Sequence, residues 1–455
     1  MEAGTGVEDL AGQVQGQVVT PGNDGWDEAR LPWNLVADQQ PEAVVKPTAP
    51  EDVVATITHA RDAGMRVTAQ ALGHGSAALG LLDETILLRM TGFGSIEIDP
   101  ERRVAKVGAG VIWRDVLNAA GEHGLAALSG SSPNVSAVPY SLGGGLSWLG
   151  RSYGLSCNNV RSIDVVTADG EFRTIDADNE PDLFWAMRGG GGNFGIATAM
   201  EINLFPHREV YAGTMIFPPD NAAEAFRAWR DWTETVPDEM TSICRILTPP
   251  DIPDVPEPLR GRMVLTLGMC YVGDPADGPE LAAPMRTLGE PIMDFVGPMP
   301  AAGLCEIHMD PEPAVPAHGH HAQIRELPDE AIDAFLGEVG PGSNTPLLLA
   351  ELRHAGGALG TVPDGAGALG SLEGAYVMLA IGLPMAPEMG PPIEAGLDDL
   401  YGAMEPWRSE AGYMNFADRP MTPEDLFPPE TLARLRDVKS KWDPDGLIRA
   451  NHDLN

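Results

Sequence analysis

The 455-residue sequence is short of positive charge. It has 29 lysine and arginine residues against 66 aspartate and glutamate residues, a formal net charge of −37, and lysine is nearly absent. Nucleic acids and anionic membranes bind to basic faces, so the composition excludes both as expected partners. A strongly acidic surface keeps a protein soluble and suits high salt. A halophilic source or a high-GC source would each account for it.

Cysteines, long apolar runs and a leader segment are also scarce or missing. The four cysteines, Cys157, Cys244, Cys270 and Cys305, match no zinc spacing and no disulfide framework. No stretch of about 18 apolar residues could span a membrane, and the N-terminus shows no basic segment followed by an apolar run. We therefore expect a soluble, cytoplasmic protein, and its oligomeric state is open.

The chain alternates strand and helix patterns, and its character changes once. Residues 42–47 are typical of a strand, the helix that follows opens with Thr48 and Glu51 at capping-box spacing, and residues 65–70 are typical of the next strand. From about Arg208, strand-like and helix-like segments are joined by proline-rich connectors. These patterns predict an α+β fold, with a second domain in which helices cover an antiparallel sheet.

Two glycine-rich runs stand out, GSSPNVSAVPYSLGGGLS at residues 130–147 and RGGGGNFGIAT at residues 188–198. The second contains G-x-G-x-x-G, but a helix-like segment precedes it and a strand-like segment follows it, the reverse of the Rossmann order. We therefore exclude a Rossmann site, and no P-loop motif is present. In the first run, backbone N–H groups beside consecutive glycines could approach a diphosphate closely. The alternative is a tight turn between packed strands.

Two histidine-containing segments are candidates for a functional role. His74 lies alone in TAQALGHGSAALG (Thr68 to Gly80), with no carboxylate or second metal ligand nearby. The run HGHH (His318–His321) could suggest a metal, but its flanking residues are typical of a surface loop, and we predict no metal site.

Five motifs stand in one order along the chain: the histidine loop, GLAALSGSSPNVSAVPYSLGGGLSWLGRSYGLSCNNV, DLFWAMRGGGGNFGIAT, GYMNF and DPDGLIRANH. In this order they resemble the FAD-linked oxidases of the vanillyl-alcohol oxidase and p-cresol methylhydroxylase superfamily, and within it the berberine-bridge-enzyme-like branch. The resemblance extends from Trp33 to Asn451. It implies a bipartite FAD-binding domain, formed by residues 1–206 (its family-typical part from about 37) and 396–455, with a substrate-binding domain at 207–395.

The resemblance also implies how FAD is held. In relatives, the histidine of a G-G-H or G-H-G loop bonds covalently to the 8α-methyl group of the isoalloxazine, and His74 in LGHG stands at that position. The alternative is a histidine that caps a turn. Many relatives form a second bond from the cysteine of a C-P-x-V segment, where this chain has Ser132. Because a hydroxyl cannot form that thioether, we expect a single covalent link, and Cys157 as a buried small residue.

The implied FAD contacts come from the histidine loop, the glycine runs, the GYMNF motif and the C-terminal tail. They are Ala71, Leu72, Gly73, His74, Gly75, Ser76, Gly80, Ser132, Val135, Ser136, Tyr140, Gly143, Gly144, Gly145, Ser147, Gly195, Ile196, Tyr413, Asn415 and Asn451. Two residues depart from the family pattern: Leu72 replaces a common glycine, and Tyr140 replaces a histidine. Tyr140 is therefore a candidate to contact the ribityl chain or the ring.

Val135 bears on the electron acceptor. In relatives, a valine at this position goes with oxygen reaching flavin C4a, and an isoleucine goes with dehydrogenase behaviour. The valine favours an oxidase that produces hydrogen peroxide.

A flavin oxidase passes a hydride to flavin N5 and needs a base for the substrate proton. Tyr413 matches the tyrosine of the family's Y-x-N segment, and its phenol, with a reference pKa near 10, could act if a nearby cation or the flavin lowers that value. In the strand LLLAELRHAGG, Glu351 and Arg353 share a face. Arginine stays protonated, so either Glu351 or Tyr413 takes the proton, or Arg353 orients a polar oxygen. The alternatives are a core tyrosine with a satisfied hydroxyl and a solvated Glu351–Arg353 pair.

The sequence thus predicts an FAD-dependent oxidase that acts on an alcohol, sugar or secondary-metabolite carbon, with a small-molecule substrate and O2 as partners. Two alternatives stay open. One is a dehydrogenase or oxidative cyclase with another electron acceptor. The other is a catalytically silent flavin- or ligand-binding protein, which only the altered SAVPY segment supports.

Overall fold

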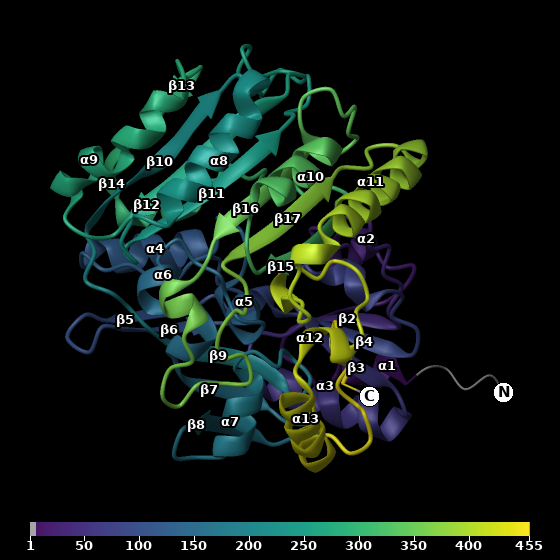
Figure 1. Ribbon diagram of the computed structural model, residues 1–455. Coiled ribbons are helices and arrows are strands. Elements are labelled where there is room, and N and C mark those ends of the chain that lie inside the picture. The colour runs from purple at the N-terminus through teal and green to yellow at the C-terminus, as the bar shows by residue number, and fades with distance from the viewer. Residues whose placement is uncertain (1–5, 455) are drawn as a thin grey trace.

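Residues 6–454, which the computed structural model describes, fold around three β-sheets with helices between and outside them (Figure 1). The expected α+β fold is confirmed. Within this part of the chain, no helix is both long and apolar enough to cross a bilayer.

The first sheet begins with the predicted β-α-β unit. Its strand order is β1-β2-β4-β3, with β2, β3 and β4 parallel and β1 antiparallel at the edge. The capping box predicted at Thr48 is wrong: Pro50 opens the helix, and the Asp52 carboxylate accepts hydrogen bonds from the Thr48 amide and hydroxyl. The elements of this part are α1 Val7–Leu10, β1 Gln17–Val19, α2 Trp26–Arg30, β2 Ala43–Lys46, α3 Pro50–Ala63, β3 Arg66–Gln70 and β4 Thr85–Arg89.

The second sheet is antiparallel, in the order β5-β6-β9-β7-β8. The segment SIDVVTADGEFRTID at residues 162–176 predicts a hairpin from its Asp169-Gly170 pair. That hairpin is present as β7 and β8, and Gly170 supplies its left-handed turn with φ of 82°. As predicted, the G-x-G-x-x-G run lies between a helix, α7, and a strand, β9. The elements are β5 Ile96–Asp99, β6 Val104–Gly108, α4 Trp113–Glu122, α5 Ala137–Leu142, α6 Gly150–Tyr153, β7 Val160–Val166, β8 Phe172–Asp176, α7 Pro181–Met187 and β9 Ile196–Asn203.

The third sheet has eight antiparallel strands in the order β13-β10-β12-β11-β16-β17-β15, with β14 paired to β10. Helices α8, α10 and α11 cover its outer face (Figure 1). The elements are β10 Glu209–Phe217, α8 Ala222–Thr233, β11 Met240–Leu247, β12 Val264–Tyr271, α9 Gly278–Ala282, β13 Met293–Asp294, β14 Gly297–Pro300, β15 His318–Ile324, α10 Asp329–Val339, β16 Leu349–His354, β17 Tyr376–Gly382 and α11 Gly390–Ala403.

Strand alternation gives this large sheet two different faces. On β16, Ala350 and Leu352 pack with the covering helices in one apolar core. Glu351 and Arg353 lie on the opposite face, and cross-strand pairing puts Arg245 of β11 directly beside Glu351. The sheet therefore turns a row of buried charged residues toward the rest of the molecule.

The domain boundary expected at residue 395 falls inside helix α11. The buried face of this helix, with Ile393, Leu397 and Leu400, belongs to the core of the large sheet. The chain stays with that sheet as far as Arg408, which bridges to Ile324 of β15. We therefore propose that the second domain ends near residue 408.

The C-terminal segment then returns to the first sheet, as Figure 1 shows in yellow. It contains α12 Pro423–Leu426 and α13 Pro429–Trp442. The tail pairs with β3: the Val67 amide donates to Leu447 O (2.9 Å), and the Arg449 amide donates to Val67 O (2.8 Å). Lys439 of α13 secures this return, since its buried ammonium donates to Asp443 (2.7 Å), Asn193 O (2.7 Å) and Ile448 O (3.0 Å).

Replacing Lys439 with methionine should therefore destabilise the protein. Removing one partner leaves Asp443 buried without its counter-charge, which costs about 3 to 5 kcal/mol. We expect Lys439→Met to lower the midpoint of urea unfolding clearly. The matched control is Lys441→Met on the same helix, because the Lys441 side chain is 58% exposed and exposed ion pairs contribute at most about 1 kcal/mol. Equal midpoints for the two variants would contradict this account of the C-terminal return.

Candidate functional site

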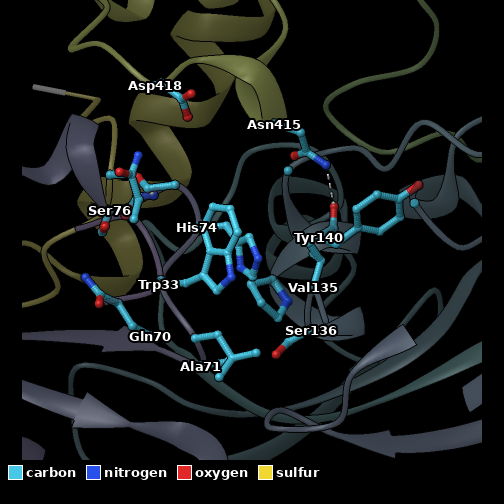
Figure 2. A pocket seen from close by; sticks show the side chains of 18 of the residues that line it. Trp33, Gln70, Ala71, His74, Ser76, Val135, Ser136, Tyr140, Asn415 and Asp418 are labelled. Carbon is cyan, nitrogen blue, oxygen red and sulfur yellow. Dashed lines mark hydrogen bonds between the residues drawn. The ribbon is translucent and has the colours of Figure 1, made fainter. Parts of the chain in front are cut away.

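A cavity of about 410 Å³ lies where the three sheets meet. It is lined by the histidine loop, the two glycine-rich runs, residues 308–317, the inner face of β16 and β17, residues 414–418 and the C-terminal tail. Figure 2 shows side chains from the histidine loop, the first glycine-rich run and residues 415–418 gathered around one space. The five sequence motifs, far apart in the chain, thus meet at a single site.

His74 lies half-buried on the loop that follows β3, and it lines the cavity. The Trp33 ring stacks on its imidazole with centroids 4.2 Å apart and an interplanar angle of 16°. Its Nε2 lies 3.2 Å from Oδ1 of Asn134. Burial lowers the pKa of His74 to about 4, so the imidazole is neutral at physiological pH and keeps one nitrogen lone pair. A neutral imidazole open to a cavity can act as a nucleophile.

The first glycine-rich run brings backbone close to the C-terminal segment. A Cβ at Gly143 would lie 1.9 Å from Oδ1 of Asn415, and Nδ2 of Asn415 donates to Tyr140 O (2.9 Å; Figure 2). A side chain at position 143 would displace Asn415. The glycine therefore permits this close approach, so the run makes room for the Asn415 side chain as well as turning the chain.

Several polar atoms around the cavity are buried and have no hydrogen-bond partner within residues 6–454. They are Gln70 Nε2, Ser76 Oγ, Ser136 Oγ, Tyr140 OH and Asn193 Oδ1. Buried polar groups are normally hydrogen-bonded, and donors and acceptors of this kind suit the hydroxyl, phosphate and ring-nitrogen groups of FAD. The residues present therefore fit the expected cofactor.

Most of the residues predicted to bind FAD line this cavity. Those that do are Ala71, Leu72, Gly73, His74, Gly75, Ser76, Ser132, Val135, Ser136, Tyr140, Gly143, Gly195, Ile196, Asn415 and Asn451. Gly80, Gly144, Gly145, Ser147 and Tyr413 are not in its wall. Among the predicted catalytic residues, Arg353 and Val135 line the cavity, and Glu351 does not.

The structure opposes Tyr413 as a base. Its side chain is buried in an apolar cluster with Leu146, Cys157 and Val377. Burial raises the pKa of Tyr413 well above its ordinary value near 10, and the backbone N–H groups of Gly145 and Leu146 oppose this rise only in part. The other interpretation, a core tyrosine, fits this burial.

Glu351 is closed off in a charged network that the sequence did not predict. Its Oε1 accepts from Arg353 Nε (2.6 Å) and its Oε2 lies 2.8 Å from His308 Nε2. Burial opposes ionisation, but Arg353 and His308 outweigh it and lower the pKa of Glu351 to about 2. The solvated Glu351–Arg353 pair is therefore wrong, because both residues are buried, and Glu351 is a weak base.

His308 extends the network into the cavity wall. Its Nδ1 lies 2.5 Å from Oδ1 of Asp310, and Asp310 in turn accepts from the Ser132 hydroxyl. Burial alone would lower the pKa of His308, yet Asp310 and Glu351 raise it. The imidazole is thus held between two carboxylates, and the large sheet is connected through it to the Ser132 loop.

Asp418 is a further cavity residue that sequence reasoning missed. Figure 2 shows it on the side of the C-terminal segment, near Asn415. Within the described residues, no hydrogen bond or ion pair reaches its carboxylate, and burial raises the pKa of Asp418 to about 7. A carboxylate with this pKa can exchange a proton near neutral pH.

The structure also places the HGHH run and Cys157. The HGHH run is not a surface loop: it forms the first half of strand β15, and His321 is buried, with its Nε2 accepting from the Tyr413 amide (2.7 Å). Cys157 is a buried residue, as predicted, and donates weakly to Leu369 O. No cysteine is among the residues that line the cavity.

Comparisons with known proteins agree with this geometry. A family model described as an FAD binding domain matches residues 41–176. The chain is 26% identical to (R)-6-hydroxynicotine oxidase of Paenarthrobacter nicotinovorans, over 97% of each protein. Among solved structures, the berberine-bridge-enzyme-like protein 1 of Physcomitrella patens superposes with a TM-score of 0.84, at 19% identity and 99% coverage of both chains. The glucooligosaccharide oxidase of Acremonium strictum, which carries a 6-S-cysteinyl, 8α-N1-histidyl FAD, superposes with a TM-score of 0.82, at 21% identity and 99% coverage. The expected cofactor, FAD, is confirmed.

Proposed function

We propose that the chain is an FAD-linked oxidase of the vanillyl-alcohol oxidase and p-cresol methylhydroxylase superfamily, which oxidises a small organic substrate with FAD attached through His74 and reduces O2 to hydrogen peroxide. The observation that carries the proposal is the His74 side chain on the wall of a cavity whose buried polar atoms have no partner within residues 6–454. This proposal agrees with the sequence analysis, which predicts an FAD-dependent oxidase.

FAD, when bound, supplies the hydride acceptor and the reaction with oxygen. The chain's own residues position the reactants. The histidine loop and glycine runs would hold the cofactor, and Asn451 closes this side, since its Nδ2 donates to Gly75 O (2.8 Å). The altered SAVPY segment does not favour a silent protein, because Ser136 and Tyr140 both line the cavity and each has a hydroxyl without a partner within the described residues.

The inner face of the large sheet favours a substrate with an apolar body. Leu349, Leu379 and Ile381 form this part of the cavity wall, and Arg353, which lies 4.9 Å from the Phe416 ring centroid, is its charged group. An oligosaccharide would need many hydrogen-bonding partners here. We therefore favour a secondary metabolite that carries one polar group for Arg353 over a sugar.

Asp418 is the proton acceptor that this geometry favours. It lines the cavity and has an unpartnered carboxylate, whereas Glu351 is held by two cationic partners and Tyr413 lies outside the wall. The substrate proton would move to a carboxylate oxygen of Asp418 as the hydride leaves the carbon.

The proposed attachment is tested by acid precipitation. We expect wild-type protein to give a yellow pellet, because a covalent bond survives denaturation, and His74→Ala to give a white pellet with any flavin in the supernatant. His123→Ala is the matched control, since His123 is exposed at the end of α4. A yellow pellet from His74→Ala would refute attachment through this residue.

The use of oxygen is tested at Val135, which lines the cavity. An added methylene at this position should narrow the approach of O2. We expect Val135→Ile to slow reoxidation by O2 about tenfold, equivalent to about 1.4 kcal/mol, and to leave substrate-dependent bleaching of the flavin unchanged. Stopped-flow absorbance measures both steps. Val362→Ile, at a position that is 64% exposed, serves as control, and an unchanged reoxidation rate in Val135→Ile would count against oxygen access here.

The proton acceptor is tested by the pH dependence of kcat/KM. A base must be deprotonated to act, so with a raised pKa of about 7 for Asp418 we expect kcat/KM to rise with pH through about 7 and level off above it. Asp418→Asn should remove this dependence and lower kcat/KM by roughly 10² to 10⁴. Asp62→Asn is the control, because Asp62 is an exposed residue of α3. A wild-type pH profile retained in Asp418→Asn would exclude Asp418 as the base.

A further inference from the structure

The carbonyl oxygen of Glu312 fixes the orientation of the Asn134 side chain. Asn134 Nδ2 donates to Glu312 O at 2.8 Å, and Trp33 Nε1 donates to the same oxygen at 3.0 Å. A backbone carbonyl only accepts hydrogen bonds, so the amide nitrogen of Asn134 must face Glu312. The amide oxygen, Oδ1, must then face His74.

This orientation decides which nitrogen of His74 carries the proton. Asn134 Oδ1 lies 3.2 Å from Nε2 of His74, and an amide oxygen can only accept. A neutral imidazole has one N–H and one lone pair, and the hydrogen bond made by one nitrogen sets the state of the other. Nε2 therefore carries the hydrogen, and the lone pair is on Nδ1.

Nδ1 is the nitrogen left free to react. Within the described residues, no hydrogen bond reaches it, and the His74 side chain lines the cavity. The Trp33 ring covers one face of the imidazole, which restricts its rotation. We propose that Asn134, oriented by the Glu312 carbonyl, is a positioning residue that directs FAD attachment to Nδ1 of His74 and away from Nε2.

This inference rests on the proposed covalent attachment. In the net reaction, one C–H bond of the 8α-methyl group and the N–H bond of His74 break, and a bond forms between Nδ1 and the 8α carbon. The two electrons released pass through the flavin to O2, which takes up both protons and leaves as hydrogen peroxide. After Nδ1 has bonded, the proton on Nε2 passes to water and on to the peroxide, while Asn134 Oδ1 accepts the hydrogen bond from Nε2 until that proton leaves.

Glu312 lies within residues 207–395, the range expected for the substrate-binding domain, whereas Trp33 and Asn134 lie in the FAD-binding part. The hydrogen bonds to the Glu312 carbonyl therefore connect the two parts beside His74. Residues 312–315 are joined to the Trp33 segment: the Val315 amide donates to Trp33 O (3.2 Å) and the Leu35 amide donates to Val315 O (3.1 Å). The Trp33 amide donates in turn to Leu72 O (2.7 Å), beside His74. Hydrogen bonds with residues 312–315 therefore take part in orienting the His74 imidazole.

The test is the identity of the linkage isomer. The flavin peptide is released from wild-type protein by trypsin, and two-dimensional NMR correlates the 8α-methylene protons with imidazole carbons. A bond to Nδ1 gives a correlation to Cγ, and a bond to Nε2 gives a correlation to Cδ2. We expect the Nδ1 isomer alone from wild type, and both isomers from Asn134→Leu, which keeps the side-chain size but cannot accept a hydrogen bond. Asn221→Leu, at an exposed position whose side chain caps no helix, is the control and should give wild-type linkage.

The outcomes separate this inference from the proposed function. A wild-type Nε2 adduct overturns the inference and leaves covalent attachment intact. A pure Nδ1 adduct from Asn134→Leu, formed at the wild-type rate, overturns the role of Asn134. A wild-type protein that carries no adduct overturns the covalent attachment itself, and this inference with it.

Discussion

The hydrogen bonds to the carbonyl of Glu312 are the constraint on which the site depends. Through them, one backbone oxygen holds both Trp33 against the face of His74 and Asn134 against its edge. Burial then keeps the imidazole uncharged. The bare loop around His74 has no carboxylate because it needs none: a reactive imidazole must be oriented and neutral, and an adjacent anion would favour its protonated form.

The large sheet supplies the other half of the site. Its outer face is apolar and packs under α8, α10 and α11, while its inner face combines a leucine-rich wall with the buried network of Arg245, Glu351 and Arg353. Charges in such a place need partners, and His308 and Asp310 complete the set. The network links the sheet to Ser132, so it aligns the substrate wall with the glycine-rich run that faces it.

Local patterns in the sequence were enough to predict much of the fold and part of the site. The β-α-β unit of residues 42–70, the strand β16 and the hairpin turn at Gly170 follow from periodicity and turn chemistry. The cavity-lining histidine loop and glycine runs follow from motif order. The resemblance also led to Tyr413 as a base, which the structure opposes, because burial depends on tertiary packing that a motif does not describe.

Other features have no local signal. His308 and Asp310 lie in a loop without periodicity, and their role depends on the register that places Arg245 beside Glu351. The polar HGHH run looks exposed in sequence, yet it is half of strand β15 because it pairs with β17, and the Tyr413 amide of the C-terminal segment donates to His321. Trp33 lies 41 positions before His74 and Asn134 lies 60 positions after it, so their roles become visible only when the fold brings both against the same imidazole.

The most direct test of the central claim is peptide mapping of wild-type protein after denaturation. Trypsin cleaves after Arg66 and Arg89 and releases residues 67–89, which contain His74. We expect this peptide to carry the mass of one FAD less two hydrogens, and fragmentation to place the addition on His74. Recovery of residues 67–89 at their unmodified mass, with FAD free in solution, would contradict it.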